Sequence, residues 1–233
     1  MKKWKTTNGC TVYQITGGRS NSYLVRDNDI SILVDTGLEN SRKELIEKLD
    51  DLLAKERLSY LTLTHAHYDH VGNAASIKEK YGPKIIIQKS EAEYLKQGTS
   101  QVPSGTNFIT CLLVAIAGKI NKFSEYEKAK PDFLVEDGYF LSPNCYLIHT
   151  PGHTDGSMSL ILDKEIALVG DAMFGVFNWS VFPPFAADVP TMIRSWGELL
   201  ETGCNTFLPG HGTKNSRKLL KKQYNKYRLK YLD

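Results

Sequence analysis

The chain has 233 residues, of which 41% are hydrophobic and 24% charged, and its formal net charge is +3. This composition is typical of a folded globular protein and excludes a disordered or low-complexity chain. The longest apolar run, residues 108–117, is about half of what a bilayer-spanning helix needs, and no apolar stretch follows the basic N-terminal residues, so we expect a cytoplasmic protein with no membrane partner.

The first half of the chain alternates strand and helix patterns. Residues 10–35 indicate three short strands separated by turns. Residues 41–56 predict a helix, because four leucines fall on one face and Ser41 and Glu44 form a capping box. The next predicted elements are a strand over residues 58–64, a helix over 71–81, a strand over 84–88 and a helix over 91–97.

Residues 98–131 have weak periodicity and are longer than an ordinary loop, so we expect an inserted helical cap there. Strand patterns return over residues 133–148 and 157–169, and a helix over 190–201 and a short strand over 206–208 follow. The alternation favours an α/β layered fold, and we expect a single domain over residues 1–233 because no linker or repeat interrupts the chain.

The C-terminal segment is a basic amphipathic helix. Residues 214–233 carry a net charge of +7, which leaves −4 on the rest of the chain. An apolar stripe is predicted to dock on the domain while the lysines face water, which we favour over a nucleic-acid or anionic-membrane patch. The stripe consists of Leu220, Tyr224, Tyr227 and Tyr231.

Cysteines 10, 111, 145 and 204 lie far apart and form no C-x-x-C pair. The sequence therefore predicts free buried thiols, and neither a structural zinc site nor a disulfide framework is indicated.

Five of the six histidines fall in three short strings: Thr64-His65-Ala66-His67-Tyr68-Asp69-His70, Pro151-Gly152-His153 and Pro209-Gly210-His211-Gly212. A single histidine is more often packed or solvated than a ligand, but a cluster after the apolar run 58–63 is hard to explain as core packing. With Asp171 there are seven nitrogen and oxygen donors, enough for two metal ions. The sixth histidine, His149, lies in a strand pattern and is expected to be structural.

The spacing suggests how the donors divide. A short strand and a tight turn can aim His65 and His67 in one direction and Asp69 and His70 in another, while His153 and His211 complete one ion each. The two oxygens of Asp171 could bridge the ions. Imidazole and carboxylate suit Zn²⁺, with Fe and Mn also compatible.

These strings resemble those of metallo-β-lactamase-fold hydrolases, in the same order along the chain. The resemblance implies a four-layer αβ/βα sandwich with a dinuclear site at one edge of two sheets. It assigns His65, His67 and His153 to one metal and Asp69, His70 and His211 to the other, with Asp171 between them. It also suggests Asp35, at the end of a strand, as a carboxylate behind the metal ligands, although an ordinary strand-end turn would explain it too.

This set predicts a hydrolase. Two ions lower the pKa of a shared water toward ~7 and polarise a carbonyl, and Asp69 is the candidate to orient the nucleophile and transfer a proton to the leaving group. We expect a small-molecule ester, thioester or lactone with an apolar moiety as substrate. The expected pocket combines the apolar run 108–117 with aromatic residues after Asp171, namely Phe174, Phe177, Trp179, Phe182 and Phe185.

The resemblance does not name the substrate. The string Gly170-Asp171-Ala172-Met173-Phe174 is similar to glyoxalase II-type thioesterases, but too few residues follow His211 for their glutathione-binding region. Quorum-quenching lactonases place tyrosine where Phe174 stands. A nuclease of the same fold is the alternative. Nucleic acid is an unlikely partner, however, because residues 170–190 contain no lysine or arginine. A metal-binding protein without activity also stays open, as does a homodimer.

Overall fold

Two mixed β-sheets form the centre of the molecule, which is described here by a computed structural model for residues 1–54, 56–101, 104–106, 110 and 125–232. The first sheet has seven strands in sequence order, and the second has six in the order β13-β12-β11-β10-β9-β8. The first sheet contains β1 (Lys3–Lys5), β2 (Thr11–Thr16), β3 (Ser22–Asp27), β4 (Ile30–Val34), β5 (Tyr60–Thr62), β6 (Lys84–Gln88) and β7 (Phe133–Val135). The second contains β8 (Gly138–Phe140), β9 (Cys145–His149), β10 (Met158–Leu162), β11 (Ile166–Gly170), β12 (Thr206–Pro209) and β13 (Asn215–Ser216).

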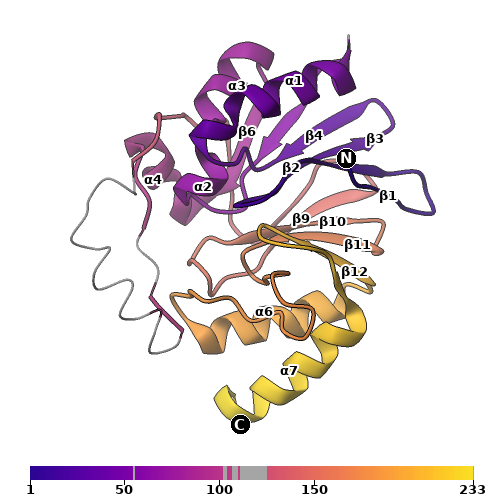
Figure 1. Cartoon of the computed structure of the whole chain (residues 1–233), viewed down its shortest axis with the longest axis vertical. Helices are drawn as coiled ribbons and strands as arrows, with labels where there is room; N and C mark the ends of the chain where they lie inside the picture. Colours follow the sequence, from indigo (N-terminus) through magenta and orange to yellow (C-terminus); the bar gives the residue numbers. More distant parts are fainter. Residues whose placement is uncertain (55, 102–103, 107–109, 111–124, 233) are drawn as a thin grey trace.

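Helices cover the outer face of each sheet (Figure 1). The first sheet carries α1 (Arg42–Leu53), α2 (Tyr68–Val71), α3 (Ala74–Tyr81) and α4 (Ala92–Gln97), with short 3-10 turns at Glu39–Ser41 and Lys89–Glu91. The second sheet carries α6 (Val189–Glu201) and α7 (Arg217–Tyr231). The order of layers is therefore helix, sheet, sheet, helix, as predicted.

Three hydrophobic clusters fill the spaces between these layers. Successive residues of β6 contribute to two of these clusters. Ile85 and Ile87 pack against the first helical layer, whereas Ile86 points between the sheets. In the second sheet, Leu160 faces the first sheet and Ile161 faces α6. Strands buried on both faces read as continuous apolar runs, which is why periodicity alone did not separate these faces.

Two details differ from the sequence-based predictions. The predicted capping box is wrong, because the Ser41 hydroxyl donates to the Leu38 carbonyl within the 3-10 turn and makes no cap bond to α1. The helix predicted over residues 71–81 is interrupted, because Asn73 bonds Thr36 through its backbone N–H and its side chain. The chain consequently forms α2 and α3 as separate helices.

The C-terminal helix docks as predicted. Leu220 is buried, and Tyr227 packs its ring 4.6 Å from that of Phe182 and 6.1 Å from that of Trp196. The lysines of α7 are exposed.

Most of the predicted cap over residues 98–131, and most of the apolar run 108–117, lie outside the described residues. The described ends attach to the domain at two places. Thr99 forms a bridge with Glu125, and Gly105 forms one with Phe185, with a backbone bond from Thr106 to Pro184 beside it.

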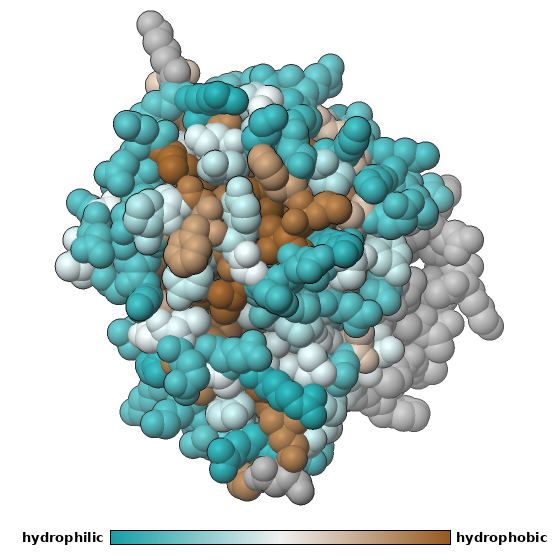
Figure 2. Space-filling model, turned by 180° about the vertical axis from the view of Figure 1, so that it is seen from behind, coloured by the Kyte–Doolittle hydropathy of each residue, from teal (hydrophilic) through white to brown (hydrophobic). Residues whose placement is uncertain are grey.

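The face opposite that of Figure 1 is mostly hydrophilic, with a band of hydrophobic residues crossing its middle (Figure 2). Among the described residues, no helix combines the length and apolar character that crossing a membrane requires.

Candidate metal centre

The first histidine string changes conformation at His67. β5 ends at Thr62, and α2 begins at Tyr68 with His67 as its extended N-cap. Asp69 and His70 lie in this short helix, and the rings of His65 and His70 are 4.2 Å apart. This one segment therefore supplies side chains to two neighbouring groups of donors.

The first group joins His65, His67 and His153. Their donor nitrogens lie within 4.8 Å of one another, with His67 Nδ1 at 2.9 Å from His65 Nε2 and 3.1 Å from His153 Nε2. Three nitrogens on one tetrahedral zinc, each at about 2.0 Å, would be separated by roughly 3.3 Å. The spacing thus fits a single ion.

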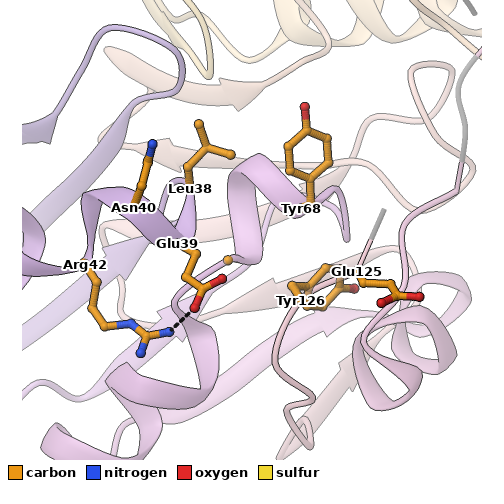
Figure 3. Close-up of a pocket in the computed structure, with 8 residues that line it drawn as sticks. Leu38, Glu39, Asn40, Arg42, Tyr68, Glu125 and Tyr126 are labelled. Carbon is orange, nitrogen blue, oxygen red and sulfur yellow. Dashed lines mark hydrogen bonds and ion pairs between the residues drawn. The ribbon is translucent and has the colours of Figure 1, made fainter. Parts of the chain in front are cut away.

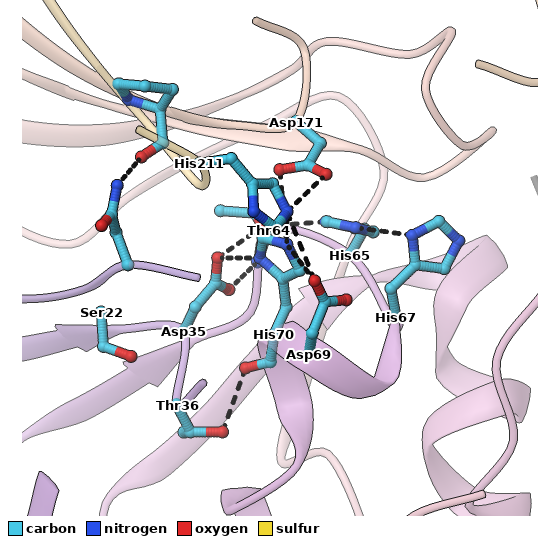
Figure 4. Close-up of polar contacts among 12 residues, drawn as sticks. Ser22, Asp35, Thr36, Thr64, His65, His67, Asp69, His70, Asp171 and His211 are labelled. Atoms are coloured by element: carbon cyan, nitrogen blue, oxygen red, sulfur yellow. Dashed lines mark hydrogen bonds and ion pairs between the residues drawn. The ribbon is translucent and has the colours of Figure 1, made fainter. Parts of the chain in front are cut away.

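The second group joins Asp69, His70 and His211, whose donor atoms also lie within 4.8 Å of one another. His211 Nε2 is 3.3 Å from Asp69 Oδ2 and 3.4 Å from His70 Nε2. Figure 4 shows these side chains converging from α2 and from the loop after β12.

Asp171 lies between the two groups. One carboxylate oxygen is 3.3 Å from His70 Nε2, and the other is 3.2 Å from His211 Nε2 and 3.5 Å from His153 Nε2. The structure therefore brings all seven predicted donors together.

Two buried atoms of this cluster have no hydrogen-bond partner among the described residues. They are Asp171 Oδ1 and His67 Nε2. Within the described part of the chain, Asp171 Oδ1 has no hydrogen bond and only an ion-pair contact with His70 Nε2, and a buried carboxylate oxygen in this state favours a cation beside it. The residues present therefore fit a pair of divalent cations.

Four imidazoles are held through the nitrogen that faces away from the cluster. The Nδ1–H groups of these histidines donate to neighbouring oxygens, which directs each Nε2 toward the cluster. The acceptors are the Thr64 hydroxyl for His65, the Asp35 carboxylate for His70, the Phe185 carbonyl for His153 and the Arg19 carbonyl for His211.

Asp35 has the supporting position that the resemblance suggested. Its carboxylate accepts from His70 Nδ1 at 2.8 Å and from the backbone and hydroxyl of Thr64 at 2.8 Å and 2.7 Å. Its φ of 57° is a left-handed conformation that a non-glycine residue rarely adopts. The strain is consistent with a backbone fixed by its functional contacts.

Burial and neighbouring carboxylates shift the pKa values of these histidines in opposite directions. Burial lowers the pKa of His67 to about 3 and that of His65 well below its usual value, so both are neutral. Although burial opposes it, the carboxylates of Asp171 and Asp69 raise the pKa of His211 to about 10. In the metal-free protein, the imidazole of His211 is therefore positively charged at neutral pH.

Small residues make room for this geometry. A Cβ atom on Gly210 would lie 2.5 Å from His70 Cε1 and closer still to Asp171 Oδ1. Gly170 has a φ of 49°, and a Cβ there would lie 2.7 Å from Thr64. The glycines beside Asp171 and His211 are thus required by close packing around the donors.

Sequence reasoning missed Glu91. It was assigned only to a helix, yet its buried carboxylate accepts the Ala66 N–H at 2.8 Å and the Gly156 N–H at 3.2 Å. It ties the first histidine string to the loop that carries His153. Its position between two helical turns gives no pattern that would have identified it.

The remaining predicted residues divide between several places. His149 lies outside the donor groups and contacts the Asp155 carbonyl, as a structural residue would. Phe174 lies against His211, with ring centroids 4.5 Å apart, whereas Phe182 packs under α6 and α7. Phe177 and Trp179 stack on each other and are exposed. The expectation that the aromatic residues after Asp171 form one pocket wall is therefore wrong for these two.

A sequence model of the metallo-beta-lactamase superfamily matches residues 15–211. The chain belongs to this superfamily. It is 28% identical over 193 residues to hydroxyacylglutathione hydrolase GloC of Haemophilus influenzae, covering 79% of this chain and 80% of the relative. It is 27% identical over 219 residues to the human acyl-coenzyme A thioesterase MBLAC2, covering 84% and 74%. The solved structure of an archaeal superfamily protein, ST1585 from Sulfolobus tokodaii, superposes with a TM-score of 0.67 at 21% identity, covering 92% and 85%.

These comparisons confirm the predicted family and the predicted sandwich fold. They establish the chain as a member of a superfamily of metallo-hydrolases that bind divalent metals.

Proposed function

We propose that this chain is a dinuclear metal-dependent hydrolase that cleaves a small-molecule ester, thioester or lactone with an apolar moiety. The observation that carries the proposal is the position of Asp171 between two triads of donors, within 3.2–3.5 Å of nitrogens from both. One carboxylate in that position fits a ligand shared by two ions. Among the two relatives described above, one is named as a thioesterase and the other as a hydroxyacylglutathione hydrolase.

The donor set indicates the metals. It contains nitrogen and carboxylate oxygen and no sulfur, which suits Zn²⁺ and is compatible with Fe or Mn. When bound, two such ions supply a water that ionises near neutral pH and a Lewis acid for the carbonyl.

Asp69 is the proposed proton-transfer residue. Its side chain is 19% exposed and that of His211 is 15% exposed, whereas Asp171, His153 and His70 are 5% exposed or less. Asp69 is therefore the carboxylate of the centre that solvent and substrate can reach. In this role it orients the nucleophile and passes a proton to the leaving group.

The surroundings favour an apolar group next to the scissile bond. The ring of Phe174 covers His211, and Tyr68 immediately precedes Asp69 on α2. A cavity of about 490 Å³ is lined by Tyr68, by the 3-10 turn before α1 and by Tyr126 (Figure 3). None of the seven donors lines this cavity, so we place the reacting carbonyl at Asp69 and His211 and not there.

The test begins with protein freed of metal by dialysis against a chelator. We expect no turnover of thioesters, aryl esters or lactones by the metal-free protein, and recovery on addition of Zn²⁺, Mn²⁺ or Fe²⁺. Turnover that is indifferent to metal would contradict the mechanism. Cleavage of phosphodiesters with all carbonyl substrates silent would replace the proposal with the nuclease alternative.

Asp69→Asn tests proton transfer, because asparagine keeps the size of the side chain but cannot carry the proton. Since Asp69 is also a donor of the second group, the metal content of the variant is measured beside its activity. We expect a fall in kcat of about 10²–10⁴-fold. The loss should be smaller for substrates whose leaving group needs no proton, such as nitrophenyl esters. An equal loss for good and poor leaving groups would overturn the assignment of Asp69.

A further inference from the structure

A second cluster of metal-ligating side chains lies between the sheets at the end away from the metal centre. Cys10 precedes β2, Asp27 ends β3 and Cys145 begins β9. β3 starts at Ser22, near the loop that carries His211, and β9 leads toward His153, so Asp27 and Cys145 stand at the opposite ends of these strands. We call Cys10, Asp27 and Cys145 the thiol cluster.

The three side chains approach one another closely. The two sulfurs are 3.9 Å apart, Cys145 Sγ is 3.8 Å from Asp27 Oδ2, and all three donor atoms lie within 4.8 Å of one another. Both cysteines are 0% exposed and Asp27 is 2% exposed. Two thiolates on one tetrahedral zinc, at about 2.3 Å each, would stand roughly 3.8 Å apart. The sulfur spacing therefore fits a shared ion, and it is near the upper limit for a thiol–thiol hydrogen bond.

Asp27 is a buried carboxylate with neutral neighbours. It accepts hydrogen bonds from Ser142, Asn144 and Asn28. Among the described residues, no lysine, arginine or histidine nitrogen forms an ion pair with it. Buried carboxylates are normally paired with a cation or coordinate a metal, and ligating carboxylates are themselves hydrogen-bonded, as Asp27 is.

We propose that Cys10, Asp27 and Cys145 bind one divalent cation of the Zn²⁺ type that joins the two sheets. Binding releases one proton from each thiol and involves no change of oxidation state. The ion would connect β2 and β3 of the first sheet to β9 of the second. This proposal is independent of the catalytic function, because the seven catalytic donors include no cysteine.

The absence of sulfur from the catalytic centre makes cobalt a selective probe. Only a thiolate ligand gives Co²⁺ a sulfur-to-metal charge-transfer absorption in the near ultraviolet. We would load the double variant Cys111→Ser/Cys204→Ser with Co²⁺, because it retains Cys10 and Cys145 as the sole thiols. We expect this absorption band, and elemental analysis of the zinc form should give one ion per chain beyond those of the catalytic centre.

Adding Cys145→Ser to this double variant provides the matched control, because it removes one of the proposed ligands. The band should disappear and the metal content should fall by one ion per chain, while carbonyl hydrolysis persists. If this variant does not fold, the band in the double variant still assigns the site, because no other thiol is present. No band in the double variant, or an intact mass lower by two hydrogens from a Cys10–Cys145 disulfide, would overturn the proposal. If the metal-loaded double variant shows the band but hydrolyses no carbonyl substrate, the thiol site stands and the proposed function is contradicted.

Discussion

At the scale of single residues, the centre combines donors that sequence could identify with supports that it could not. His65, His67 and Asp69 stand in a recognisable string, and the family resemblance suggested Asp35. The carbonyls of Arg19 and Phe185, which hold His211 and His153, could not be predicted because any residue type offers a carbonyl. Only the three-dimensional path of the chain selects them.

Asp35→Asn tests the support of His70. Asparagine keeps the shape but loses the charge that holds the Nδ1–H of His70, so we expect the zinc affinity of the site that contains His70 to fall roughly 10–100-fold. Competition with a chromophoric chelator measures this. Asp50→Asn, at a carboxylate paired with Lys80 on the surface, is the control and should leave both affinities unchanged. Unaltered zinc binding in Asp35→Asn would show that this contact does not tune the site.

Gly210→Ala tests the close packing around Asp171. The added methyl would lie 2.5 Å from His70 Cε1, so the two side chains must move apart. We expect the variant to bind at least one zinc ion fewer per chain by elemental analysis while remaining folded by circular dichroism. Gly138→Ala, where the nearest atom is the Leu147 carbonyl at 3.2 Å, should retain the full metal content. Full metal content in Gly210→Ala would contradict the packing argument.

At the scale of elements, apolar spacing predicted helices well and local polar chemistry predicted them poorly. The stripe of α7 docks as its spacing indicates, because burial of several rings outweighs local preferences. The boundary between α2 and α3 depends on Asn73, whose partners lie about 35 residues earlier in the chain. Such long-range hydrogen bonds leave no mark on local periodicity, and for the same reason the Ser41 cap was predicted wrongly.

Tyr227→Ala tests the docking of α7. The ring contacts both Phe182 and Trp196, and its loss should lower the free energy of unfolding by about 2 kcal/mol in chemical denaturation. Lys222→Ala, on the exposed face of α7, should change it by less than about 0.5 kcal/mol. Equal effects of the two substitutions would contradict a docked stripe.

At the scale of the whole molecule, the sandwich brings donors from both sheets to one edge. The first sheet supplies the string after β5, and the second supplies the loops after β9, β11 and β12. Composition and the alternation of strand and helix patterns predicted the layered fold class. The prediction that segments about 140 residues apart converge came from the family resemblance. Strand pairing over such separations cannot be derived from local patterns.

The charge of the centre predicts how the metal-free protein responds to pH. His211 has a pKa of about 10 in the folded state against 6.5 for an unperturbed imidazole, so its contribution to stability is complete below about pH 6.5 and is lost as pH rises toward 10. We expect the Tm of the metal-free protein to fall over this interval. Zinc should remove most of this fall, because the ion takes the place of the proton.

His211→Gln is the control for this titration. Glutamine cannot carry the proton, so the metal-free variant should show a flatter decline of Tm between pH 6.5 and 10. A decline as steep as that of the unsubstituted protein would place the titrating group elsewhere.

We propose that the seven donors hold two ions with Asp171 between them. Anomalous diffraction at the zinc edge, from crystals of the zinc-reconstituted protein, tests it directly. We predict two peaks about 3.5–4 Å apart, one within the His65, His67 and His153 triad and one within the Asp69, His70 and His211 triad. A single peak there, or none, would contradict the account.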